Sequence, residues 1–173
     1  MKPEDLLPVL TFSGAEKQLA RKFGIPADAM IPLFFSFRFG GGWCYGTEAI
    51  RTISVVKRTT VYDETARTGF SREEIFLFLN PVCTAREGNV LRLEKCGEEK
   101  TRLLVERPFW IRIRADRILK ATVNPVVREI ATEELAVHEM DFEGSTAANA
   151  AHELEHLADR AISGVHLWEF HFT

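Results

Sequence analysis

Two histidine–glutamate pairs lie close together near the end of the sequence, in AVHEMDFEGSTAANAAHELEH (136–156). Only the second pair is followed by another histidine, in the spacing His152-Glu153-x-x-His156. Residues i and i+4 of a helix project from the same face, so both imidazoles can bind one metal ion. The glutamate beside the first ligand can then act as general base toward a water molecule that the metal activates. The motif predicts a metal-dependent hydrolase.

The residues around His152 favour a metal site over a chance pairing on a solvated helix face. Four of the five residues 147–151 are alanine, which indicates a buried helix. Histidine and glutamate side chains in such a helix need partners, and a metal ion supplies them. The first pair is interpreted differently, because Phe142 stands where its second histidine would be. We therefore predict that His138 is an ordinary strand residue.

A catalytic metal usually has three protein ligands, and the third lies outside the motif. Only 17 residues follow His156 in the 173-residue chain, which favours an upstream ligand, although His166 and Glu169 stay open. The upstream candidates are the cysteines Cys44, Cys83 and Cys96, because a thiolate binds iron, cobalt, nickel and zinc strongly. Cys96 is the leading candidate, since a turn in LEKCGE would expose its thiol.

The composition predicts one globular domain over residues 1–173, with 46% hydrophobic and 27% charged residues. A formal charge of −3 and the absence of a Lys/Arg cluster argue against nucleic-acid binding. No apolar run approaches the roughly 20 residues that cross a bilayer, and MKPEDLLPVLTFSG does not have the pattern of a secretory signal. We therefore expect no membrane association. Three cysteines without a CxxC pair fit a reducing compartment.

The elements that must position the motif are expected to be mostly strands. Residues 4–23 predict a helix that ends near Gly24, whereas residues 29–39 fit either a helix or a strand. Residues 118–142 are expected to add a loop and one or two strands. Short segments rich in Val, Ile, Leu and Phe, bounded by turn residues, predict β structure at 52–62, 74–81, 89–95, 102–108 and 110–115.

The helix of the histidine motif is predicted to begin with Ser145 or Thr146 as N-cap and to continue to Gly164. Residues 165–173 then form a short strand or an amphipathic end segment. The fold class predicted from these elements is α+β, with antiparallel strands packed around a metal-binding helix near the C-terminus.

The order of these segments resembles peptide deformylase. The resemblance spans roughly residues 50–165 and is carried by FLNP, LEKCGEE, RLLVERPFWIRIRA and FEGSTAANAAHELEHLADRAISG. It implies a peptide-deformylase-like fold. Arg102 and Arg107 fall where that family has arginines downstream of its metal-binding cysteine.

The resemblance also implies a site and a reaction. Cys96, His152 and His156 match the metal ligands, and Glu153 matches the catalytic general base. The metal implied is one divalent ion, Fe²⁺ in the cell, replaceable by Zn²⁺, Ni²⁺ or Co²⁺. The implied reaction removes the formyl group from the N-terminal methionine of newly made peptides and releases formate. The implied partner is an N-formylmethionyl peptide, met at the ribosome in the cytoplasm or in a mitochondrion or plastid.

Two motifs depart from the family pattern mildly. The family's EGCxS motif reads EKCGE at residues 94–98, which keeps the glutamate and the cysteine. In the HExxH helix, Glu155 stands where the family has aspartate. Residues 121–140 are extra chain before that helix, and we interpret them as an insertion.

The larger departure is the family's first motif, GxGxAAxQ, whose counterpart is GGGWCYGTE (40–48). The glutamine that helps to hold the oxyanion is absent, and Thr47 or Glu48 takes its place, depending on the alignment. Gly42 and the N–H of Gly97 complete the expected oxyanion and substrate contacts. The missing glutamine motivates a second hypothesis, a paralogue that binds metal but has lost or altered its activity. A metallopeptidase on another fold is a third.

Overall fold

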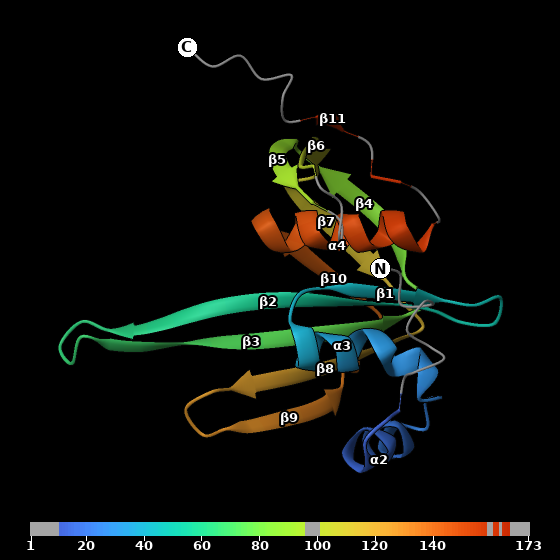
Figure 1. Ribbon diagram of the computed structural model, residues 1–173, viewed down its shortest axis with the longest axis vertical. Helices are drawn as coiled ribbons and strands as arrows, with labels where there is room; N and C mark the ends of the chain where they lie inside the picture. Colours follow the sequence, from blue (N-terminus) through green and yellow to red (C-terminus); the bar gives the residue numbers. More distant parts are fainter. Residues whose placement is uncertain (1–10, 96–100, 159–160, 163, 167–173) are drawn as a thin grey trace.

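The computed structural model describes residues 11–95, 101–158, 161–162 and 164–166. Its helices are α2 (Gly14–Phe23), α3 (Ile31–Phe39) and α4 (Gly144–Leu157), and a short 3-10 helix, η2 (Asp28–Met30), precedes α3. The strands are β1 (Trp43–Gly46), β2 (Arg51–Asp63), β3 (Thr68–Leu79), β4 (Val82–Glu87), β5 (Val90–Glu94), β6 (Leu103–Arg107), β7 (Trp110–Arg114), β8 (Arg117–Asn124), β9 (Glu129–Glu134), β10 (Glu139–Glu143) and β11 (Val165–His166). These elements confirm the α+β class (Figure 1).

Helix α2 ends where the sequence predicted and begins later. Ser13 caps its first turn, because the Ser13 hydroxyl accepts from the Glu16 N–H while the Glu16 carboxylate accepts from the Ser13 N–H. Gly24 ends the helix in a left-handed conformation at φ 61°, which glycine adopts without strain. The helix predicted for residues 4–23 therefore starts only at Gly14 within the described residues.

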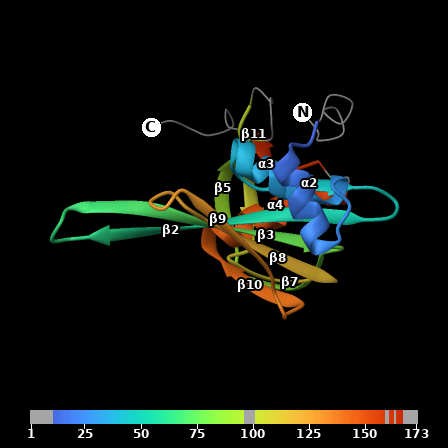
Figure 2. The ribbon, with the colours of Figure 1, turned by 90° about the horizontal axis from the view of Figure 1, so that it is seen from below.

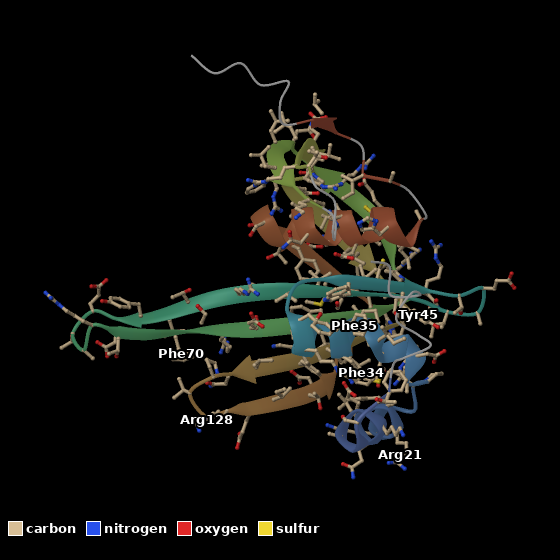
Figure 3. All side chains as sticks on the ribbon, in the orientation of Figure 1. Arg21, Phe34, Phe35, Tyr45, Phe70 and Arg128 are labelled. Carbon is tan, nitrogen blue, oxygen red and sulfur yellow. The ribbon has the colours of Figure 1, made fainter. Side chains whose placement is uncertain are left out.

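Residues 29–39, for which the sequence allowed a helix or a strand, are helical. Pro32 lies in the first turn of α3, where its missing N–H costs no hydrogen bond. Phe34 and Phe35 are fully buried (Figure 3). Phe34 packs in the cluster between α2, α3 and the large sheet, and Phe35 packs in a separate cluster with Tyr45. The helix is apolar on nearly all sides, so its sequence carries no helical periodicity.

Antiparallel pairing joins the strands into three sheets. The largest has the order β1-β2-β3-β8-β9, and two smaller sheets have the orders β10-β7-β4 and β11-β6-β5. Strand β4 was not expected, because its mostly exposed residues VCTARE lack an alternating apolar pattern. In Figure 1 the smaller sheets and α4 lie on one side of the large sheet, and α2 and α3 lie on the other.

Each face of the large sheet carries its own hydrophobic cluster. Along β3, Ile75 and Leu77 join a cluster with α2 and α3, whereas Phe76 and Phe78 join one with β7, β10 and α4. This alternation follows from the two-residue period of a strand. The sheet thus separates an α2–α3 layer from the layer that contains α4.

Both ends of α4 differ from the prediction. The helix begins at Gly144, after Glu143 and not after Ser145 or Thr146, because β10 continues directly into it and the Gly144 N–H donates to the Phe109 carbonyl at 2.7 Å. It ends at Leu157, short of Gly164. Gly164 instead lies against β6, where an added Cβ would be 2.6 Å from the Leu104 carbonyl oxygen.

Residues 121–140, interpreted as an insertion, form an integral part of the sheets. They complete β8, form β9 and begin β10, so the segment 118–142 contributes three strands where one or two were expected. His138 lies in the bend before β10 and not in a strand. Its Nδ1 lies 2.8 Å from the Asp116 carbonyl oxygen, a structural hydrogen bond.

Within the described residues, none of the helices is both long and apolar enough to span a lipid bilayer.

Candidate metal centre

Helix α4 approaches the large sheet closely because its buried face is built from small side chains. Ala147, Ala148 and Ala150 are almost completely buried, as the alanine-rich sequence predicted. At the end of the helix, the Arg51 guanidinium of β2 donates to the Leu157 carbonyl oxygen. That contact satisfies one of the free carbonyls of the last turn and places a positive charge at the negative end of the helix dipole.

The two motif histidines face each other on α4. His152 Nε2 and His156 Nε2 are 3.0 Å apart, and the two rings are nearly perpendicular, at 77°. A tetrahedral ion with bonds of about 2.0–2.1 Å would hold two nitrogen ligands about 3.3 Å apart. The helix therefore presents both Nε2 atoms at almost the separation that one ion requires.

A carboxylate from β5 fixes the orientation of His152. Its Nδ1 lies 2.8 Å from Glu94 Oε2, so the ring donates the Nδ1 hydrogen and its Nε2 carries the lone pair. Histidines that bind metals commonly donate their other ring N–H to a carboxylate in this way. The separation of 58 residues between the two partners means that β5 must dock on α4 to make this contact.

A buried arginine holds Glu94 in turn. Arg107 on β6, only 3% exposed, donates to both oxygens of Glu94, with the shortest contact 2.7 Å from Nη2 to Oε2. Its Nη1 lies 2.7 Å from Glu155 Oε2, a close ion pair. Arg107 therefore ties β5, β6 and α4 together through charge.

These contacts determine the charge of Glu94. Burial alone would raise the pKa of Glu94, but hydrogen bonds from His152 and Arg107 outweigh it and lower the pKa to about 2. Glu94 is therefore ionised at neutral pH, which suits a carboxylate that accepts a hydrogen bond from an imidazole.

The environment of Glu153 shifts its pKa in the opposite direction from that of Glu94. Its residue as a whole is partly buried, but its carboxylate is surrounded by protein atoms, and this desolvation raises the pKa of Glu153 to about 7. An added Cβ on Gly42 would lie 3.1 Å from Glu153 Cγ and 3.3 Å from Oε1. The absence of a side chain at Gly42 thus leaves room for a carboxylate that can exchange a proton near neutral pH.

The described structure brings together only part of the ligand set inferred from the sequence. Cys96 and Gly97 lie outside the described residues. Cys83 is exposed on β4, where its Sγ lies 3.5 Å from the Ala85 carbonyl oxygen. Cys44 on β1 packs against the cluster that includes α4. Within the part of the chain that the structure describes, no group of three or more His, Cys, Asp or Glu residues is arranged to hold an ion.

The two candidates for the missing glutamine lie in the turn after β1. The Thr47 hydroxyl accepts from the N–H groups of Ala49 and Ile50 at 3.3 and 3.2 Å, so it is occupied within its own turn. Glu48 is exposed in the same turn. Gly42, in contrast, lies beside Glu153.

Other sequence candidates lie away from the histidine pair or outside the described chain. His166 is on β11 opposite Leu103, Glu169 is outside the described residues, and exposed Arg102 approaches the Leu93 carbonyl oxygen at 3.5 Å. The sequence did not suggest a role for Arg51, which acts on α4 across 106 residues. No local pattern marks a contact of that range.

Comparisons of the chain with protein-family models, with curated proteins and with solved structures find no match to any of them.

Proposed function

We propose that this protein is a metal-dependent hydrolase of the peptide-deformylase type, with a peptide-deformylase-like fold. It removes the N-formyl group from the N-terminal methionine of newly made peptides. The observation that carries this proposal is the pair of facing Nε2 atoms on His152 and His156, 3.0 Å apart, with Glu94 fixing one ring. The motif order LEKCGE…HELEH supports the deformylase type among metallohydrolases.

His152, His156 and Cys96 would hold one divalent ion. The Nδ1–Glu94 contact leaves the His152 Nε2 facing the His156 Nε2 at hydrogen-bond distance, and a bound ion would replace that contact. A mixed nitrogen and thiolate set suits Fe²⁺, Zn²⁺, Ni²⁺ or Co²⁺. We propose Fe²⁺ as the ion in the cell. When bound, the ion would supply Lewis-acid chemistry, which lowers the pKa of water and polarises the formyl carbonyl.

Glu153 is the proton carrier of the proposed reaction. Its carboxylate accepts a proton from the water that attacks the formyl carbon, and then donates that proton to the methionine nitrogen as the carbon–nitrogen bond breaks. The products are formate and a free amine. A pKa raised to about 7 suits this shuttle, although a cation beside Glu153 would lower that pKa.

The proposed substrate is an N-formylmethionyl peptide, met at or near the ribosome, in the cytoplasm or in a mitochondrion or plastid. The formal charge of −3 supports a substrate other than nucleic acid.

One observation favours a second candidate, a paralogue that binds metal and has lost or altered the activity. The Thr47 hydroxyl is hydrogen-bonded within its own turn and Glu48 is exposed, so neither replaces the oxyanion donor that the glutamine would provide. Loss of one such donor costs about 10²–10³ in rate.

Formate release and bound metal, measured together, distinguish the two candidates. We expect the Fe²⁺-loaded protein to bind one ion and to release formate from a formyl-Met-Ala peptide. Glu153→Ala should keep the ion and lose about 10²–10⁴ in rate, because only the proton carrier is removed. Glu64→Ala, in the exposed turn between β2 and β3, is the control and should behave as the wild type.

The opposite outcomes are equally informative. An ion bound by the wild type without any formate would exclude the hydrolase and favour the paralogue. Unchanged metal affinity in Cys96→Ser would show that the third ligand is another residue.

A further inference from the structure

Strands β2 and β3 continue as a two-stranded arm (residues 59–72) beyond the rest of the large sheet. Pairing of β2 with β1 stops at Ser54, and pairing of β3 with β8 starts at Glu73. The β2–β3 pairing itself runs without a break to Asp63 opposite Thr68. Figure 2 shows the arm projecting from the body of the molecule.

The arm exposes large apolar side chains although it has no core to cover them. Val61 is 46% exposed and Tyr62 is 54% exposed, and Phe70 is paired with Val61 across the two strands (Figure 3). The Tyr62 ring covers Gly69, where an added Cβ would lie 2.9 Å from Tyr62 Cδ2. A two-stranded ribbon that buries neither face is marginally stable in water. The arm therefore has the properties of a segment that gains stability from a partner.

The outer edge of β2 lacks the features that prevent edge pairing. Segment 59–62 reads TTVY, without charge or proline, and the pairing register has no bulge. Two other edge strands do have such features, since the β4 register shifts between Cys83 and Ala85 and β9 is acidic. The acidic residues of β9 are Glu129, Glu133 and Glu134.

The free stretch of this edge is short and has a defined centre. At its inner end, the Arg58 side chain extends toward Gly40, the residue that follows α3, and its Nη2 lies 3.7 Å from the position of a Cβ there. At its outer end, β2 stops at Asp63. Val61 is the middle residue of the free stretch 59–63.

We propose that the arm is a self-association surface, on which β2 of a second copy of this chain pairs antiparallel about Val61. Two-fold pairing places Val61 against Val61 and Thr60 against Tyr62, residues with high β propensity. It also places Arg58, whose Nε donates to Glu73 of its own chain at 2.6 Å, opposite Glu64 of the second copy. Each end of the pairing then has a guanidinium between two carboxylates, which is complementary in charge. The arm as a whole has two acidic and two basic residues, Asp63, Glu64, Arg67 and Arg72, which does not suit a polyanionic partner.

Sedimentation of the whole chain over a range of concentrations tests the proposal. We expect the mean mass to rise toward that of a dimer with concentration. Val61→Lys would place two ammonium groups opposite each other and should weaken the dimer roughly tenfold or more. The arm buries little, so this variant should keep the circular-dichroism spectrum and melting temperature of the wild type.

Ile130→Lys is the matched control, because Ile130 is also an exposed β-branched residue, 51% exposed, on the acidic edge strand β9. It should leave the association unchanged. A mass that stays monomeric up to about 1 mM would overturn the proposal, since even very weak pairing is visible there. Equal effects of the two lysine variants, or a dimer that ignores Val61→Lys, would overturn it too.

Discussion

The imidazole ring of a histidine can rotate about two side-chain bonds, and at His152 the contact with Glu94 prevents this rotation. The carboxylate accepts from Nδ1 at 2.8 Å and is itself held by Arg107. The chain His152–Glu94–Arg107 therefore aims Nε2 toward His156 before any ligand arrives. Preorientation of this kind reduces the ordering cost of binding an ion.

Replacing Glu94 by glutamine tests that role. Glu94→Gln keeps the shape but weakens the contacts to His152 and Arg107, and we expect metal affinity to fall about 10- to 100-fold. Glu106→Gln is a suitable control, since Glu106 is exposed on β6 and bonds Asn89. Competition with a fluorescent chelator measures both affinities. Equal affinities in the two variants would contradict the role of Glu94.

Glu94 also predicts how stability depends on pH. The pKa of Glu94 is lowered from 4.5 to about 2 in the folded protein, by hydrogen bonds from His152 and Arg107 that outweigh burial. The stabilisation is therefore fully present above pH 4.5 and is lost as the pH falls toward 2. It amounts to about 3 kcal/mol at most. Urea unfolding between pH 6 and pH 2 should show a steeper loss for the wild type than for Glu94→Gln, and parallel curves would contradict this.

At the scale of elements, the site depends on the close approach of α4 to β1. An added Cβ on Gly42 would lie 2.9 Å from the Ser54 carbonyl oxygen and 3.1 Å from Glu153 Cγ. Gly42→Ala should therefore displace Glu153, lower turnover about 10²-fold and cost about 1–3 kcal/mol of stability. Metal affinity should change little.

Gly46, at the other end of β1, offers the matched control. A Cβ there would meet only the flexible ends of Leu157 at 3.3 Å and Arg51 at 3.8 Å. Gly46→Ala should leave turnover within about twofold and stability within about 1 kcal/mol. Turnover that is equal in the two alanine variants, measured by formate release, would exclude a special role for Gly42.

The elements differ in how well the sequence predicted them, for identifiable reasons. The α4 helix and β7 were predictable, because alanine-rich and alternating segments carry a clear period. The ends of α4 were not, since Phe109 and Arg51 fix them through contacts distant in sequence. Strand β4 gave no signal because it is mostly exposed.

The site divides in the same way. His152, Glu153 and His156 are marked by a local motif, and Glu94 and Arg107 stand in segments that the family resemblance had already matched. Their mutual contacts depend on how β5, β6 and α4 dock, which spacing along the chain does not encode. The ion pair between Arg107 and Glu155 also depends on this docking, and the sequence did not predict it.

For the whole molecule, the large sheet separates the α2–α3 layer from the site. Phe34 is fully buried in the α2–α3 cluster. Phe34→Ala should lower the free energy of unfolding by about 3–5 kcal/mol, while metal affinity per folded molecule stays unchanged. Phe142→Ala is the contrast, because Phe142 stands just before α4 and makes edge-to-face contacts with Phe76 and Phe78, with ring centroids 5.5 and 5.9 Å apart. It should lower both quantities, as urea unfolding and chelator competition would show.

The range of the contacts made by α4 has a kinetic consequence. Its partners lie far back along the chain, with Glu94 58 residues before His152 and Arg51 106 residues before Leu157. Contacts this distant form late and slowly. During synthesis Gly42 and the strands that carry Glu94 and Arg107 leave the ribosome before α4, which supplies both histidines. Capture of the proposed ion would therefore be coupled to one of the last steps of folding, and a nascent chain would stay without the ion until its sheets have assembled.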